Sequence, residues 1–313
     1  MRHRQRCRAA ALPTKVQLAR RAHSHRASLF AAPACALQLP KMRVPLAGGG
    51  QESLLSEVGA QYLLPLFTTR DACALRLVCR EFLAAVTEQP WEDRGTVIMG
   101  SIGAWRACFP RALCASVASG PSWRPKVNPR RQAPVVDADF VHLQGLLELN
   151  MSGCREVTDA AFAHLRGVRA LNMNYCSHLI TDAAFEHLRG SIRALSISMC
   201  RGVTGAAFAH LCGIHTLDMS SCNQISITDA AFVHLRGIHT RDMGGCSQAG
   251  ITDAALVHLR GVHNLNLGGC TQFITEASFA PLRGVHALMM GGCSPGAVAA
   301  ARAQGLRVTL PEL

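Results

Sequence analysis

The feature that most constrains this chain is a sequence repeat that fills its second half. The stretch "ITDAAFVHLRGIHTRDMGGC" at 227–246 returns as "ITDAALVHLRGVHNLNLGGC" at 251–270. Seven copies in all begin at Val136, Val157, Ile180, Val203, Ile227, Ile251 and Ile274, and each copy closes on a cysteine. Units of this length cannot bury an apolar face alone, so the copies must stack and share one core.

Each copy predicts a short helix, a turn and a short strand. In the copy at 157–176, Thr158 and Asp159 are typical of a helix N-terminus, and the apolar residues after them have helical spacing. "RG" then closes the helix, and "VRALNMNYC" alternates as a strand does, with Leu171 and Met173 on one side and asparagines on the other. Stacked copies therefore predict a curved parallel sheet lined outside by helices.

The cysteine at the end of each copy predicts a buried ladder along the stack. A cysteine side chain is small and buryable, and its weak S–H donor can meet a backbone carbonyl at the turn. Disulfides or a metal row are the alternatives, but no two cysteines have C-x-x-C spacing, and successive ladder cysteines are 22–24 residues apart. Fourteen cysteines without a disulfide framework fit a reducing compartment.

Histidine recurs at two positions of the repeat. One row precedes a buried leucine of the helix and consists of His142, His164, His187, His210, His234 and His258. The other row comes directly before the strand and consists of His215, His239, His263 and His286. Because duplication copies any harmless surface residue, we expect both rows to be solvated. Metal binding or pH sensing is the alternative.

The "LxLxxC" strands and the "ITD" that opens the helices resemble the cysteine-containing subclass of leucine-rich repeats, over 136–293. The resemblance implies an α/β solenoid with parallel strands on a concave face and short helices outside. Arg241 stands where Leu is usual, Gly205 where Asp is usual and Pro281 where His is usual. We expect local irregularities at these positions, without a break in the solenoid.

The ends of an open stack need caps. Residues 100–118 predict a helix and a strand for the N-terminal cap. After the last repeat, "SPGAVAAARAQG" predicts a final helix, and "LRVTL" at 306–310 predicts a final strand.

Residues 54–91, before the repeats, predict a small helical hairpin. Apolar residues from Leu54 onward fit a helix that ends near Pro65, and "TTRD" predicts the connecting turn. Asp71 is then expected to cap an amphipathic helix of about four turns. Trp91 is expected to close the hairpin.

Within this hairpin, "LRLVCREF" at 75–82 and the later Trp91 resemble an F-box, although "LL" stands where that family usually has "LP". The resemblance implies docking on a Skp-type adaptor of a cullin complex, an SCF-type ubiquitin ligase, while the repeats hold a protein substrate. The adaptor-binding residues that it implies are Leu54, Leu55, Pro65, Leu66, Asp71, Leu75, Val78, Cys79 and Phe82. The alternative is that these residues only pack the hairpin as a cap on the solenoid.

The concave face is the expected binding surface for an unknown protein substrate. Its candidate residues come from strand positions between the buried ones and from the turns after them: Glu148, Asn150, Asn172, Asn174, Tyr175, Ser196, Ser198, Asp218, Ser220, Asp242 and Asn266. The alternative is that they are merely solvated. No phosphate-binding glycine loop, zinc-protease helix or serine nucleophile motif is present in the sequence, so we expect no enzyme activity, no cofactor and no bound metal.

The positive charge of the chain is concentrated in its N-terminal tail. The net charge is +12, but residues 1–51 carry 10 Lys and Arg and no acidic residue, which leaves 22 basic and 20 acidic residues in 52–313. Because no basic stripe is evident in the body, we expect no specific nucleic-acid binding. No apolar run is long enough to span a membrane.

These observations divide the chain into five parts: a basic tail at 1–51, an F-box-like module at 52–94, a cap and linker at 95–135, seven repeats at 136–296 and a C-terminal cap at 297–313. Residues 1–41 have the arginine-rich look of a transit peptide, but Met42 offers a second plausible start. We expect a cytoplasmic or nuclear protein, or an organellar one if residues 1–41 are a transit peptide.

Overall fold

The computed structural model describes residues 64–310 except 78–79, 118–133, 177 and 271–274. The chain divides into two compact units, Met1–Gln89 and Pro90–Leu313, which we describe separately. Four of the predicted adaptor-binding residues lie outside the described residues: Leu54, Leu55, Val78 and Cys79.

The described part of the first unit contains a 3-10 turn, η1 (Leu64–Leu66), and two short helices, α3 (Thr69–Leu75) and α4 (Arg80–Glu88). The prediction of a single four-turn helix is therefore wrong, because α3 ends at Leu75 and α4 begins at Arg80. The apolar residues keep helical spacing across this break, so their periodicity does not reveal it. Asp71 is also not the cap. The amide and hydroxyl of Thr68 donate to Asp71 Oδ2 at 3.3 and 2.9 Å, and the Asp71 amide donates back to Thr68 Oγ1 at 3.2 Å. This is a capping box, with the threonine as cap.

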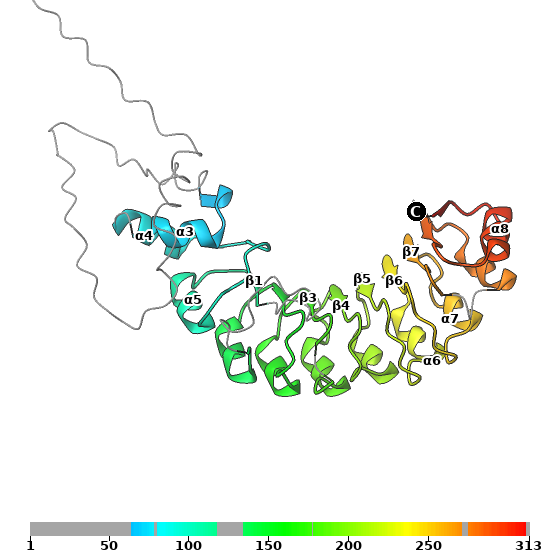
Figure 1. Ribbon diagram of the computed structural model, residues 1–313, viewed down its shortest axis with the longest axis horizontal. Helices are drawn as coiled ribbons and strands as arrows, with labels where there is room; N and C mark the ends of the chain where they lie inside the picture. Colours follow the sequence, from blue (N-terminus) through cyan, green and yellow to red (C-terminus); the bar gives the residue numbers. More distant parts are fainter. Residues whose placement is uncertain (1–63, 78–79, 118–133, 177, 271–274, 311–313) are drawn as a thin grey trace, which may run out of the picture. The chain divides into compact units, whose positions relative to one another are not determined.

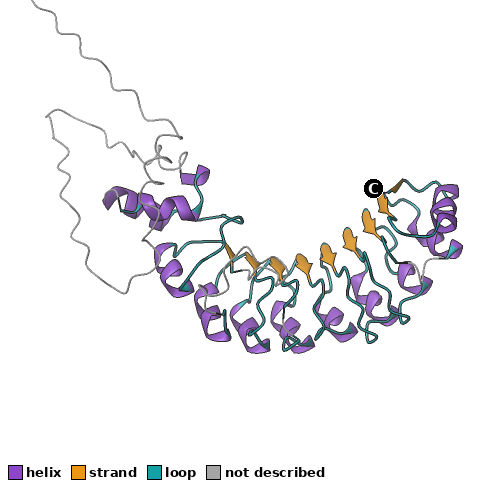
Figure 2. Cartoon of the chain, in the orientation of Figure 1, coloured by secondary structure: helices purple, strands orange, loops and turns teal. Residues whose placement is uncertain are grey.

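The second unit is built on a parallel sheet whose described strands follow one another in chain order (Figures 1 and 2). The strands are β1 (Cys114–Ser116), β2 (Glu148–Asn150), β3 (Ala170–Asn172), β4 (Ala194–Ser196), β5 (Thr216–Asp218), β6 (Thr240–Asp242), β7 (Asn264–Asn266), β8 (Ala287–Met289) and β9 (Val308–Thr309). They stay in register from repeat to repeat, so that Leu149 pairs with Leu171 and Leu171 with Leu195. The predicted α/β leucine-rich-repeat solenoid is confirmed.

Short helices lie on the outer side of this sheet, and the strands line the inner side of the arc (Figure 2). They are η3 (Asp137–Leu143), η4 (Asp159–His164), η5 (Asp182–Leu188), η6 (Gly205–His210), α6 (Asp229–Phe232) with η7 (Val233–Leu235), α7 (Asp253–Val257) and η8 (Glu276–Leu282). Most are 3-10 rather than α-helical. A repeat of this length leaves room for only one or two turns, where 3-10 geometry is common.

The shared core is a set of columns that run from repeat to repeat. One column consists of helix phenylalanines with no exposed surface, Phe140, Phe162, Phe185, Phe208, Phe232 and Phe279. Another consists of the middle residue of each strand from β2 to β8, which is leucine in six of these seven strands and arginine, Arg241, in β6. Each residue thus completes the burial of its counterpart in the next copy, as expected for a stack.

The helix and the strand that we predicted at each end of the repeats are both present. At one end, α5 (Ile102–Cys108) begins at Ser101, whose hydroxyl accepts from the Ala104 amide at 3.2 Å, and leads into β1. At the other end, α8 (Pro295–Ala303) begins at Ser294 and leads into β9.

Trp91, which we expected to close the helical hairpin, belongs to the second unit. Its ring meets Phe109 edge-on with 5.6 Å between centroids, and its carbonyl accepts the Leu113 amide at 2.8 Å. The aromatic contact and the bond to the chain before β1 tie Trp91 to the N-terminal cap of the solenoid.

Arg241 is the most unusual residue of the core. It occupies a leucine position in β6, is 1% exposed, and keeps the strand in register, as predicted. Its guanidinium lies 4.7 Å from the ring centre of Phe232 and 5.6 Å from that of Phe208, and Nη2 contacts Met219 Sδ. Nε and Nη1 have no hydrogen-bond partner among the described residues. Burial lowers the pKa of Arg241 to about 10.

Candidate functional site: the concave face

The cysteine ladder fixes the turns that end the strands, and the predicted S–H bond to a carbonyl is confirmed. Cys176 Sγ donates to the Met151 carbonyl of the preceding repeat at 3.1 Å. The five later ladder thiols make the equivalent bond at 2.9–3.2 Å. Burial raises the pKa of the Cys200, Cys222 and Cys270 thiols to about 12. These cysteines therefore remain protonated near neutral pH and serve the architecture.

A second ladder, which the sequence analysis missed, links the helices. Thr181 caps its own helix by accepting the Ala183 amide at 3.4 Å. Its amide and hydroxyl also donate to Asp159 of the preceding repeat, at 2.7 and 2.6 Å. The same arrangement recurs along the stack. It is interrupted where Gly205 supplies no carboxylate to Thr228, whose side chain makes no capping bond to its helix.

Strand alternation brings most of the predicted substrate-binding residues onto one half-exposed face. In β2 to β7 the first and third residues are partly exposed and the middle residue is buried. This places Glu148, Asn150, Asn172, Ser196, Asp218, Asp242 and Asn266 side by side on the concave face. Asn174 and Ser220 are also half-exposed, and Tyr175 is exposed. Ser198 differs from the others because only 7% of it is exposed and its amide donates to Asn174 Oδ1 at 2.7 Å.

Several of these side chains are oriented by their own backbone. The side-chain oxygens of Asn150, Asn172, Asp218, Asp242 and Asn266 each accept an amide two residues on, at 2.8–3.1 Å. Asn266 Nδ2 also donates to Asp242 Oδ1 at 3.0 Å. Each of these hydrogen bonds holds one oxygen of the side chain in place. The other polar atom of the side chain therefore keeps a fixed orientation on the concave face.

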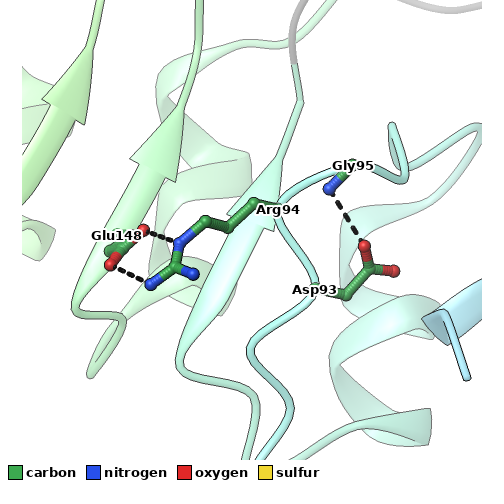
Figure 3. Close-up of polar contacts among 4 residues, drawn as sticks. All are labelled: Asp93, Arg94, Gly95 and Glu148. Atoms are coloured by element: carbon green, nitrogen blue, oxygen red, sulfur yellow. Dashed lines mark hydrogen bonds and ion pairs between the residues drawn. The ribbon is translucent and has the colours of Figure 1, made fainter. Parts of the chain in front are cut away.

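An ion pair that the sequence analysis missed lies at the N-terminal end of the face (Figure 3). Arg94 meets Glu148 with two parallel bonds, Nη2 to Oε1 at 2.6 Å and Nε to Oε2. The bond from Arg94 lowers the pKa of the Glu148 carboxyl. Beside Arg94, Asp93 Oδ1 accepts the Gly95 amide at 3.0 Å. Because Arg94 lies outside the repeats, no periodic signal in the sequence could have identified it.

A shallow cavity of about 280 Å³ covers the concave side of β1 to β5. Arg94 and Glu148 lie at one end of it, and its floor includes Ala170 and Ala194. Small residues on the floor let a ligand approach the sheet closely, and the ion pair supplies charge at one end.

Two large side chains stand where the turn favours glycine. Tyr175 and Met199 have φ angles of 58° and 57°, at the repeat position that Gly153, Gly245 and Gly269 occupy in other copies. The side chains are 39% and 47% exposed. A non-glycine residue in this region costs about 1 kcal/mol, and such strain is a reason to suspect function. We predicted Tyr175 as a contact but missed Met199, which the departure from glycine could have revealed.

In the first unit, the described adaptor-binding candidates lie largely on the surface. Pro65 is exposed, Leu66 is 62% exposed, and Phe82 is half-buried. Asp71 is exposed and engaged in the capping box; the side chain of Leu75 lies outside the described part. Leu77 and Leu83 are 55% and 40% exposed, which adds two apolar side chains to this surface.

Within the described ranges, no group of three or more His, Cys, Asp or Glu side chains could hold a metal ion. Nor is any helix there long and apolar enough to cross a membrane.

The chain is similar to known proteins in structure but not in sequence. No protein-family model and no curated protein sequence matches the chain. Among solved structures, the TLR13–ssRNA13 complex is similar at 19% identity and a TM-score of 0.47, over 62% of this chain but only 26% of that one. Internalin C2 from Listeria monocytogenes matches at 14% identity and a TM-score of 0.47, over 66% of this chain and 84% of that one. Rad7, in the yeast Rad7–Elc1 complex, matches at 14% identity and a TM-score of 0.47, over 70% and 64%. At these identities the likeness is one of fold.

Proposed function

We propose that this chain is a non-catalytic substrate receptor, which holds a protein substrate on the concave face of its solenoid. The observation that carries the proposal is the pair Tyr175 and Met199, exposed apolar side chains kept in strained left-handed conformations beside a row of fixed polar groups. Protein interfaces typically have apolar side chains at the centre and polar groups around them.

We further propose that the first unit docks on a Skp-type adaptor of a cullin ubiquitin ligase, as the F-box resemblance implies. The support is the exposure of Leu66, Leu77 and Leu83 in the described part of the first unit, which contains the short helices α3 and α4. Apolar side chains on short helices favour docking of partner helices. The role of the whole chain is then positional, because it holds the substrate near the ubiquitin-charged enzyme and raises its effective concentration.

Co-purification of the full chain with a tagged Skp-type adaptor tests this role. A Leu66→Asp, Leu83→Asp variant should lose the adaptor, because charge is introduced at two exposed apolar positions. The matched control is Ile225→Asp, which changes an 81% exposed residue of the second unit and should bind like wild type. If wild type fails to bind while circular dichroism shows it folded, the ligase role is refuted.

The second candidate function is a repeat scaffold without a ubiquitin role, in which the concave face alone acts. We place the ligase receptor in the cytoplasm or nucleus. Cell fractionation with N-terminal sequencing of the mature chain decides the point, because cleavage within residues 1–41 in an organelle would favour the scaffold.

A further inference from the structure

The histidines directly before the strands form a continuous column on the solenoid. The rings of His215 and His239 stack at 4.6 Å between centroids with 12° between their planes. His239 and His263 follow at 4.7 Å, and His263 and His286 at 4.5 Å. Three of these four rings are on exposed residues, and His239 is half-buried. We call these four residues the histidine column.

Basic residues extend and flank the column, which corrects our expectation that the body has no basic stripe. The His215 amide donates to the Arg193 carbonyl, and the Arg193 amide to the Arg169 carbonyl. Two exposed arginines therefore occupy the position directly before β3 and β4, which is the position that the histidines occupy in later copies. In the loops before His239 and His263, Arg236 and Arg260 are exposed.

The acidic groups nearest along these strands are on the concave face. Asp218 and Asp242 follow His215 and His239 by three residues, and each accepts an amide of its own turn. Between each histidine and its aspartate lie a threonine and a buried strand residue, which is Leu217 after His215 and the cationic Arg241 after His239. The effects that lower the pKa of His239 are burial and then the neighbouring His215 and His263, with no carboxylate among them.

The hydrogen bonds of the column indicate how it can change with pH. His263 Nδ1 lies 3.3 Å from Asn264 Oδ1, while Asn264 Nδ2 donates to Thr240 Oγ1 at 3.4 Å. Because a carboxamide oxygen only accepts, neutral His263 carries its hydrogen on Nδ1. Its Nε2, which has no partner among the described residues, can donate to a carboxylate only after the ring takes up a second proton.

We propose that the histidine column, with Arg169 and Arg193, binds an extended acidic segment of the substrate protein and takes up protons as it does so. This inference rests on the proposed role of the solenoid as a protein receptor but not on the ligase role. The six positions span five strand spacings, about 24 Å, which an extended peptide of about seven residues covers. Without a ligand, protonation of all four histidines is unfavourable, because two imidazolium ions this close repel each other. The carboxylates of a bound peptide offset this repulsion between imidazolium ions.

An acidic peptide fits this surface better than a nucleic acid does. The imidazole faces are occupied by one another and cannot stack on bases, which single-strand binding relies on. The adjoining concave face carries Glu148, Asp218 and Asp242, which a continuous phosphate backbone would have to avoid. A short acidic segment can lie along the column alone.

The test measures binding of a fluorescent (Glu-Ser)₄ peptide to the full chain by anisotropy, between pH 8 and pH 6 at fixed ionic strength. Affinity should rise as pH falls, because the peptide remains ionised while imidazoles gain protons. We expect about tenfold tighter binding per pH unit for each proton taken up. A His239→Gln, His263→Gln variant should lose this gain. The matched control, His234→Gln, His258→Gln, changes the outer row in the same two repeats and should keep it.

The basic tail is common to all three proteins, so the pH-dependent difference between the variants isolates the column. Binding that does not change with pH, or an equal loss in the two double variants, would overturn the proposal. A clear preference for a single-stranded RNA of equal charge over the peptide would overturn the peptide assignment. Adaptor co-purification depends on the first unit, so failure here is distinguishable from failure of the ligase role.

Discussion

Replacing Arg241 by leucine should stabilise the solenoid. Arg241 pairs in register with Leu217 on one side and Leu265 on the other, so leucine would continue an existing column. The guanidinium is 1% exposed, and two of its nitrogens have no hydrogen-bond partner among the described residues. A buried charge without a paired anion is among the most costly features of a core.

The magnitude follows from burial and chemistry. Burial lowers the pKa of Arg241 to about 10 from the ordinary 12.5. That difference corresponds to about 3 kcal/mol against the charged side chain. Loss of the contacts with the Phe232 and Phe208 rings offsets about 1–2 kcal/mol of the gain. Burying leucine contributes about 1.5–3 kcal/mol, and the smaller side chain leaves a void that costs about 1 kcal/mol. The expected increase in the free energy of unfolding is about 2–4 kcal/mol.

The pH dependence gives this prediction a definite sign. Because the folded-state pKa of Arg241 lies below the unfolded value, the unfolded chain binds more protons between the two values, and wild-type stability rises with pH there. Below about pH 10 the residue is charged in both states and the full penalty applies. The difference between Arg241→Leu and wild type should therefore be constant from pH 6 to pH 9.

Urea denaturation followed by circular dichroism measures the effect. Arg260→Leu is the matched control, because it removes an exposed arginine of the neighbouring repeat and should change stability by less than about 0.5 kcal/mol. Equal or lower stability of Arg241→Leu would mean that the guanidinium is well compensated in the fold, and the reasoning would fail.

Three further predictions concern the ladders and the strained turn. Asp182→Ala should lower the free energy of unfolding by about 1–3 kcal/mol in urea denaturation, because the Thr204 amide and hydroxyl, at 2.7 and 2.5 Å, lose their shared carboxylate. N-ethylmaleimide followed by peptide mass spectrometry should label exposed Cys212 well before buried Cys200, whose thiol pKa is about 12. Tyr175→Gly should be more stable than Tyr175→Ala by about 1 kcal/mol in thermal unfolding, because only glycine adopts a φ of 58° without strain.

Each of these has a contrary outcome. Glu186→Ala, at an exposed site of the same helix as Asp182, should leave the free energy of unfolding nearly unchanged. If it lowers that free energy as much as Asp182→Ala does, the Asp182 hydrogen bonds have no specific stabilising role. Equal labelling rates for the two thiols would mean that the ladder opens readily. Alanine as stable as glycine at position 175 would show that the turn relaxes and stores no strain.

The repeat predicted most of the fold because each copy supplies independent support for the same period. The cysteine bonds and both caps could also be predicted, since they depend on local chemistry at known positions. The Asp159–Thr181 bond could not, because helix capping already gave the two residues a local explanation, and only the distance between neighbouring helices reveals the second bond. Arg94 was missed because its partnership with Glu148 joins residues 54 positions apart outside any period.

Residues that recur in the copies and residues that occur once have different roles in the proposed recognition. Residues that recur in nearly every copy are engaged with a neighbouring copy, Cys200 with the preceding one and Asp182 with the next, and have few polar atoms left for a ligand. The histidine column recurs too, but it presents the same ring in each copy, so under our proposal it recognises only charge and extent along the solenoid. Discrimination among acidic segments must come from features that occur once, namely Tyr175, Met199 and the Arg94–Glu148 pair. A substrate that satisfies the column alone should bind weakly and with strong salt dependence, whereas one that also reaches the strained turn should bind tightly and release slowly.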